Sequence, residues 1–171
     1  SGTVDVGLGV LAAAKALGLE FLPVLNDRLS AFVPLGHPLA HHRRLTLEQL
    51  ADQPIILTGR DSSVREQVDA LFDQTRLTMN AGMEANYMST VLALVRQGLG
   101  ISVLPESAAD SLAGLKRIPI DHPGVNREIG LISRSGMGLS PAAQRCFDLL
   151  NEQLNVGGGL PPIAECQSHI S

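Results

Sequence analysis

Short apolar stretches that suit β-strands alternate along this 171-residue chain with stretches that suit α-helices. This alternation is typical of a largely parallel sheet covered by helices, because each parallel strand needs a crossover connection before the next one. Hydrophobic residues make up 44% of the chain and charged residues 18%, as in globular proteins. The sequence therefore predicts an α/β fold. The expected strands are residues 4–8, 21–25, 29–33, 55–57, 79–83, 101–104, 115–120 and 129–133.

Capping residues mark the expected ends of the helices. Thr46 and Gln49 have the spacing of a capping box, and Ser63 and Glu66 form a second one. Glycine just beyond a helical stretch favours a left-handed stop. The other expected boundaries are a stop at Gly18 after residues 11–17, an N-cap at Asn86 with a stop at Gly98, and a start at Ser140 and Pro141 for the last helix.

Two irregular segments are expected between these elements. Asn26 and Asp27 predict a turn between two strands. Residues 34–44 contain prolines and the histidines His37, His41 and His42, which suit neither a regular helix nor a central strand. No acidic residue stands at a recognisable ligand spacing from these histidines, so a solvated loop is favoured over a metal site.

Composition argues against several classes of function. A net charge of −4 does not favour binding of a nucleic-acid backbone by this segment. Cys146 and Cys166 are far apart and have no histidine at ligand spacing, so we expect neither a zinc site nor a disulfide framework. No apolar run approaches the roughly 18 residues that a membrane-spanning helix needs. We expect a cytoplasmic protein with no cofactor and no membrane partner.

An enzyme alternative rests on a glycine pattern near the start. Gly7-x-Gly9-x-x-Ala12 follows a predicted strand, and Asp27 lies about 20 residues further on, as in a dinucleotide-binding fingerprint. The helix after it would be short, and Pro23 would interrupt the next strand. A glycine-lined strand end is therefore favoured over the site of a dinucleotide-dependent oxidoreductase. No other catalytic motif occurs, so we expect no enzymatic activity.

A ligand site is predicted around residues 58–65, where a strand end, a glycine turn and a helix N-terminus follow one another. N-terminal N–H groups of helices attract anions, and ligands of open α/β sheets bind at such turns. Ser62 and Ser63 either contact a ligand or only cap the helix, and Arg60 adds a cation. Residues 84–87 are a second candidate, with capping and core packing as the alternative. A carboxylate or another polar anionic group would suit the first candidate, and the second could face the same crevice.

Four motifs occur in a fixed order along the chain: G-x-V-D-V-G-L at residues 2–8, H-P-L-A at 37–40, V-x-x-G-x-G-I-x-x-L-P at 95–105, and L-S-P-A-A at 139–143. Their order and spacing resemble those of the effector-binding domains of LysR-type transcriptional regulators. The third motif is the most specific. The resemblance extends from Gly2 to about Asn155.

The resemblance implies two Rossmann-like lobes of the type II periplasmic-binding-protein kind, joined by two crossing strands, with the first lobe incomplete. Residues 1–20 and 127–155 would form the first lobe, 21–126 the second, and 156–171 a tail. It also implies a small effector held between the lobes and a homodimer or homotetramer. By position, the effector-binding residues would be Gly9, Val10, Arg60, Asp61, Ser62, Ser63, Glu84, Asn86 and Tyr87.

The resemblance further implies an allosteric sensor, whose effector alters how attached DNA-binding domains sit on operator DNA. The abrupt start near Val4 leads us to expect that a winged helix-turn-helix and one wall of the pocket lie upstream of this sequence. A type II solute-binding protein is the alternative with the same architecture. The missing export signal does not favour that alternative.

Overall fold

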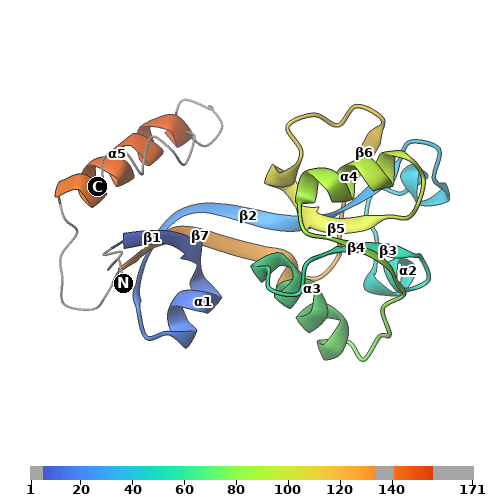
Figure 1. The fold of residues 1–171 in the computed structure, drawn as a ribbon, viewed down its shortest axis with the longest axis horizontal. Helices are drawn as coiled ribbons and strands as arrows, with labels where there is room; N and C mark the ends of the chain where they lie inside the picture. The colour runs from blue at the N-terminus through green and yellow to red at the C-terminus, as the bar shows by residue number, and fades with distance from the viewer. Residues whose placement is uncertain (1–5, 134–140, 156–171) are drawn as a thin grey trace. The chain divides into compact units, whose positions relative to one another are not determined.

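The computed structural model describes residues 6–133 and 141–155 (Figure 1). Two compact units are present: Ser1–Asn26 with Arg127–Ser171, and Asp27–Asn126. We call them the first and the second unit. The boundaries fall inside strand β2 (Glu20–Pro34) and after the first residue of β7 (Asn126–Ser133), so these two strands continue from one unit into the other. Val4, the Ser140 cap, Cys166 and the 156–171 tail lie outside the described residues.

The first unit contains β1 (Val6–Val10), which pairs antiparallel with β7, and the short helix α1 (Leu11–Ala16) that follows it directly. Gly18 ends α1 with a φ of 64°, as the sequence predicts. The Gly18 N–H donates to Lys15 O and the Leu19 N–H to Ala14 O, which is the Schellman arrangement. Helix α5 (Pro141–Asn155) also belongs to this unit, and its Cys146 is buried.

The predicted turn at Asn26 and Asp27 is wrong, because β2 is one strand of 15 residues. Within the second unit it pairs antiparallel with β5 (Ser102–Pro105) on one side and β6 (Leu115–Pro119) on the other. The Asp27 carboxylate, which could have closed a turn, accepts instead from the Arg28 N–H at 2.9 Å and from Ser107 Oγ at 2.6 Å. The chain thus stays extended through Asn26 and Asp27, and the ladders to β5 and β6 begin just beyond them, at Leu29 and Ser30.

In the second unit, β5 and β6 flank β2 in one sheet, and β3 and β4 form a two-stranded sheet beside it. Strand β3 (Ile55–Thr58) pairs parallel with β4 (Ala81–Ala85) and meets β5 through a parallel bridge between Ile55 and Ile101. Since β2 opposes both β5 and β6, the other four strands run in one direction. The predicted largely parallel sheet is therefore confirmed for these four, and β2 is the exception.

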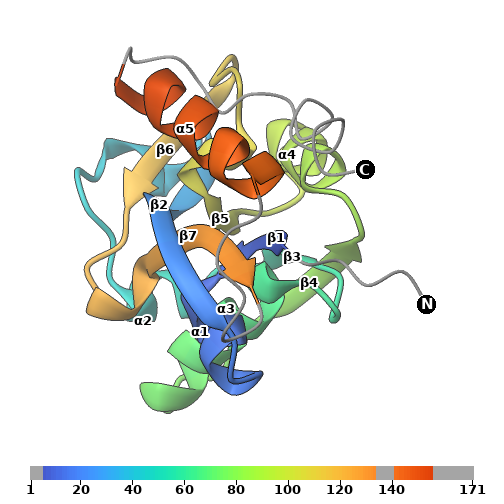
Figure 2. The same ribbon diagram turned by 90° about the vertical axis from the view of Figure 1, so that its left-hand side faces the viewer.

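Three helices cover this sheet: α2 (Leu47–Ala51), α3 (Ser63–Gln74) and α4 (Met88–Arg96). Helices α3 and α4 lie on opposite faces of it, in both views (Figures 1 and 2). The predicted capping box at Thr46 and Gln49 is present, with both reciprocal bonds. The core between the layers is aliphatic, and its fully buried side chains include Leu29, Phe32, Leu50, Ile56, Leu71, Val91 and Leu104.

Two of the short 3-10 helices begin with a histidine followed by proline. His37 precedes η1 (Pro38–His41), and His122 precedes η3 (Pro123–Val125). Each imidazole caps its helix, because its Nδ1 accepts the backbone N–H two residues on, at 3.1 and 3.0 Å respectively. His37 is therefore a half-buried capping residue, while His41 and His42 are exposed as expected. Within the described part of the chain, no three potential metal-ligand side chains gather together.

Glu106, the first residue of a third short helix, η2 (Glu106–Ala108), links this helix to β2. Its carboxylate accepts from Ser30 Oγ at 2.7 Å and from Arg28 Nε at 2.9 Å. Burial alone would raise the pKa of this carboxyl group. The two hydrogen bonds and the charges of Arg28 and Arg117 outweigh burial, so the pKa of Glu106 is lowered from its ordinary value of 4.5.

A Glu106→Gln variant should lose stability at neutral pH, because the amide keeps the shape of the side chain without its charge. Folding lowers the pKa of Glu106, so the carboxylate stabilises the fold above its unfolded pKa, and this contribution is lost as pH falls through the folded pKa. Urea unfolding of both proteins from about pH 7 down to about pH 3 measures the difference. The gap should close in acid, and a gap independent of pH would contradict this role.

Candidate functional site

The carboxyl ends of β3 and β4 lie at the same edge of the second unit's sheet, because the two strands are parallel. Residues 58–63 lead from β3 into α3, and residues 84–88 lead from β4 into α4. We call these two segments together the carboxyl edge. They touch, since a Cβ added at the buried Gly59 would lie 3.1 Å from Asn86 Oδ1. The N-termini of α3 and α4 therefore start from neighbouring turns.

Ser62, and not Ser63, caps helix α3. Its Oγ accepts the Arg65 N–H at 3.1 Å and lies 2.8 Å from Thr58 Oγ1, while its own N–H donates to Gly59 O. The predicted capping box of Ser63 and Glu66 is thus wrong by one residue. The Thr58 hydroxyl at the end of β3 explains the difference, because it holds the Ser62 side chain in the capping position. Ser63 is the first helical residue and is exposed.

Helix α4 begins without a side-chain cap. Its N-cap is Tyr87, which makes no capping hydrogen bond, so the predicted Asn86 cap is wrong. The first-turn N–H groups of a helix have no acceptor within the helix itself and give its N-terminus a partial positive charge. Both helices of the carboxyl edge therefore direct the positive ends of their dipoles toward it. At the other end of α4, the predicted stop at Gly98 is confirmed, with a φ of 77°.

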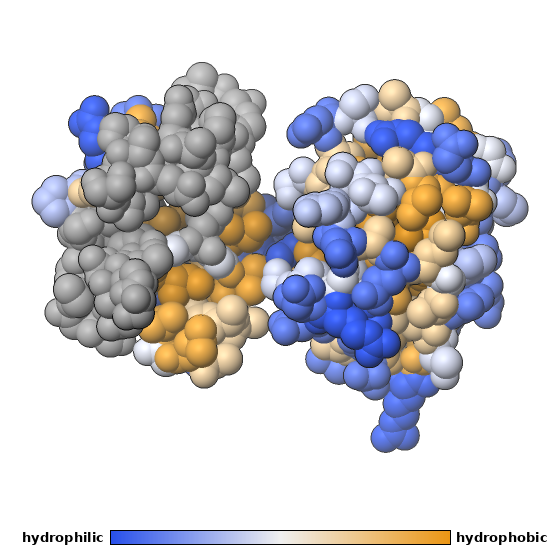
Figure 3. Space-filling view, in the orientation of Figure 1, coloured by the Kyte–Doolittle hydropathy of each residue, from blue (hydrophilic) through white to orange (hydrophobic). Residues whose placement is uncertain are grey.

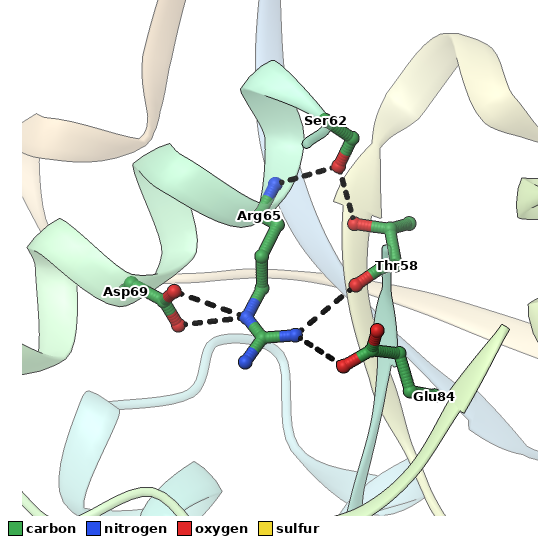
Figure 4. Close-up of polar contacts among 5 residues, drawn as sticks. All are labelled: Thr58, Ser62, Arg65, Asp69 and Glu84. Atoms are coloured by element: carbon green, nitrogen blue, oxygen red, sulfur yellow. Dashed lines mark hydrogen bonds and ion pairs between the residues drawn. The ribbon is translucent and has the colours of Figure 1, made fainter. Parts of the chain in front are cut away.

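One buried guanidinium joins the parts of this edge (Figure 4). Arg65 Nε donates to both carboxylate oxygens of Asp69, at 2.9 and 3.0 Å, within α3. Arg65 Nη1 donates to Thr58 O at the end of β3, at 3.2 Å, and to Glu84 Oε2 of β4, at 2.9 Å. The Arg65 side chain is only 8% exposed. A single side chain thus connects α3, β3 and β4.

Arg65 stays charged in this position. Burial by itself disfavours the charged form, but the hydrogen bonds and the charges of Asp69 and Glu84 outweigh it and raise the pKa of Arg65. A buried guanidinium is tolerated only when it is paired and hydrogen-bonded, as it is here. The sequence analysis missed Arg65. Its spacing of three and seven residues from Val68 and Phe72 places it beside the apolar face of α3, and a charge at such a position indicates a buried ion pair.

The other predicted residues occupy different surroundings. Arg60 and Asp61 are exposed in the turn between β3 and α3, and Asn86 is exposed after β4. Gly9 and Val10 end β1 in the first unit, where a side chain at Gly9 would overlap that of Ile132. The structure thus brings the predicted residues of 60–63 and 84–87 together at one edge. That these residues bind an effector stays a prediction.

The glycine pattern of the enzyme alternative does not lie in the strand–helix–strand motif that a dinucleotide site needs. Strand β1 pairs with an antiparallel partner, and α1 has only six residues. A dinucleotide fingerprint belongs to parallel strands joined by a full helix, whose N-terminus holds the pyrophosphate. Asp27 is 8% exposed and bonded to Ser107, so it is not presented to a ribose. The geometry favours the glycine-lined strand end.

The carboxyl edge also carries apolar surface. Tyr87 is 73% exposed, and Met83, in β4 just before the edge, is 44% exposed. Figure 3 shows one face of the second unit, on which an apolar area (orange) lies among hydrophilic side chains (blue), without marking the residues of the carboxyl edge. Small-molecule sites commonly combine apolar walls with a few placed polar groups. None of the helices in residues 6–133 and 141–155 is long and apolar enough to span a bilayer.

The family model of the LysR substrate binding domain matches residues 1–155. The uncharacterized HTH-type transcriptional regulator YybE of Bacillus subtilis (strain 168) is 31% identical over 141 residues, which cover 82% of this chain and 48% of that protein. A probable hydrogen peroxide-inducible genes activator of Mycobacterium avium is 30% identical over 160 residues, covering 90% of this chain and 50% of that protein. The chain thus spans about half the length of these relatives.

Solved structures support the same assignment. The effector-binding domain of QuiR in complex with shikimate has a TM-score of 0.70 and 27% identity to this chain, over 91% of this chain and 74% of that one. The likeness confirms the predicted fold class, an α/β fold of the type II periplasmic-binding-protein kind. The alternative of a dinucleotide-binding fold is not supported by these comparisons.

A Ser62→Ala variant should unfold more easily, because it removes the cap of α3 and the bond to Thr58. Loss of an N-cap costs about 0.5–2 kcal/mol. Ser62→Asp, which keeps an acceptor for the Arg65 N–H, should retain most of the stability and serves as the control. Thermal unfolding followed by circular dichroism measures both. If Glu66→Ala were as destabilising as Ser62→Ala, the box predicted at Ser63 and Glu66 would be the true cap.

Proposed function

This chain belongs to the LysR substrate-binding domain family, and from this premise we propose that its carboxyl edge binds a small carboxylate effector. The observation that carries the proposal is the meeting of two helix N-termini at the neighbouring turns of residues 58–63 and 84–88. Helix N-termini favour carboxylates and phosphates because of their N–H groups and their dipoles. Two of them at one edge add their fields at the same place.

The side chains of this edge suit such a ligand. Arg60 is exposed in the first turn and supplies a cation, while Ser63 is exposed at the first helical position. The apolar surface of Tyr87 is available for the carbon skeleton of a ligand. The QuiR domain binds shikimate, which is a hydroxylated carboxylic acid, and this supports the same chemical class for this chain. We include Gly9 and Val10, in the first unit, as further effector-binding residues.

The relatives are named as a transcriptional regulator and a probable genes activator, which supports a role for the whole protein in transcriptional regulation. We propose that the two compact units are the two lobes of a sensor, which has no catalytic activity of its own. Its effector would bias the state of a cytoplasmic homodimer or homotetramer on operator DNA, through a DNA-binding domain outside this sequence. An effector can shift such an equilibrium only by as much as its affinities for the two states differ.

Replacing Ser63 tests where the carboxylate binds without removing the Ser62 cap. Ser63→Asp places a negative charge in the first turn of α3, which stabilises the helix by about 0.3–1 kcal/mol but repels an anionic ligand. The variant should keep or raise its melting temperature and should no longer be stabilised by shikimate or by related hydroxylated carboxylates. Ser63→Asn has similar size and no charge, and should still respond.

Thermal shift measurements with increasing ligand report both effects, because a ligand at about 100 times its Kd stabilises the folded state by about 2.7 kcal/mol. Equal ligand-induced shifts in the Asp and Asn variants would place the carboxylate elsewhere. If no carboxylate of this size stabilised the unsubstituted chain, the proposed class of effector would be wrong.

A further inference from the structure

We propose that Arg65 and Glu84 are positioning residues, which set the spacing between the two turns of the carboxyl edge. In this account Glu84 does not contact the effector, in contrast to the prediction from the sequence. The inference rests on the proposed function, because it explains how that site is held in shape. It adds a role for the ion pair between the buried Arg65 and Glu84.

The contacts of Arg65 reach both turns. Its Nη1 atom bonds Thr58 O, at the start of the first turn, and Glu84 Oε2, at the start of the second. Thr58 in turn holds the Ser62 cap through its hydroxyl group. One planar guanidinium with several fixed donors can make such contacts together, which an ammonium group cannot do with the same geometry. Arg65 therefore links the start of α3 to the end of β4.

The second turn depends on this link because it has few other side-chain restraints. Strand β4 pairs with β3 on one side only, among the described residues. Three residues after Glu84 stands Tyr87, the N-cap of α4, which makes no capping hydrogen bond. The Arg65–Glu84 bond of 2.9 Å fixes the last part of β4 before this N-cap. Pairing of β4 with β3 up to Ala85 sets the approximate position of the α4 N-terminus, and the Arg65–Glu84 bond refines it.

Glu84 is poorly suited to touch the effector itself. Its charge would repel the carboxylate for which the two helix N-termini are suited. One of its oxygens is already engaged by Arg65. A positioning role uses the charge of Glu84 favourably, because it neutralises a buried cation.

Asp69 provides a matched control for Glu84. Both carboxylates lie 2.9 Å from an Arg65 nitrogen, and both side chains are 43% exposed. The difference is that Asp69 stands on α3 itself, four residues after Arg65, whereas Glu84 stands on β4. Removing Asp69 weakens an ion pair within one helix. Removing Glu84 releases one turn of the carboxyl edge from the other.

The first experiment compares Glu84→Ala with Asp69→Ala in the absence of ligand. Amide hydrogen exchange should speed up over residues 85–90 in the Glu84→Ala protein and should stay near the unsubstituted rates there in the Asp69→Ala protein. Circular dichroism confirms that both variants are folded, and Glu84→Gln is the milder replacement if Glu84→Ala is not. Equal exchange over residues 85–90 in the two variants would overturn the positioning role.

The second experiment measures shikimate binding by calorimetry in a double-mutant cycle of Arg65→Met and Glu84→Ala. Each single change should weaken binding about tenfold, and the double variant should be no weaker than either, because both remove the same link. Losses that multiply would instead assign Glu84 an independent contact with the ligand. If the unsubstituted chain does not bind shikimate, the proposed effector class fails, and the exchange comparison still decides the positioning role.

Discussion

Parallel pairing of β3 with β4 is the constraint from which the rest of the second unit follows. Strands that run in one direction must end at one edge, and the connections that leave them must start there. Helices α3 and α4 therefore begin at neighbouring turns although they cover opposite faces of the sheet. No particular side chain is needed to bring the two positive helix ends together. The side chains of the edge refine a geometry that the strand order has already imposed.

Arg65 is the main refinement. A guanidinium beside the apolar face of α3 would be costly alone, and it is stable because Asp69, Glu84 and the Thr58 carbonyl satisfy it together. Each partner comes from a different element or turn, so the charge can be buried only when these parts are correctly placed. The need to neutralise the Arg65 charge therefore favours one arrangement of α3, β3 and β4. The same logic applies to Glu106, which is paired with the more exposed Arg28 and holds η2 against β2.

Much of this fold could be predicted from the sequence. The capping box at Thr46, the stops at Gly18 and Gly98 and the apolar face of α3 depend on neighbours close in the chain, and all were correct. The errors came from side-chain and strand contacts that a reading of local preferences does not weigh. Strand β2 stays extended through Asn26 and Asp27, and the Asp27 carboxylate bonds Ser107, 80 residues further on. Thr58, four residues before Ser62, selected Ser62 as the cap in place of Ser63. Glu84 acquired Arg65, 19 residues before it, as a partner.

The central claim is that a carboxylate effector binds at the carboxyl edge of the second unit. The most direct measurement is a titration of the ¹⁵N-labelled chain with shikimate, followed through the backbone amide resonances. The account predicts that the largest shifts occur at residues 62–65 and 87–90, the first turns of α3 and α4, while residues 115–119 of β6 stay unchanged. Shifts that spare both first turns and gather elsewhere in the chain would contradict it.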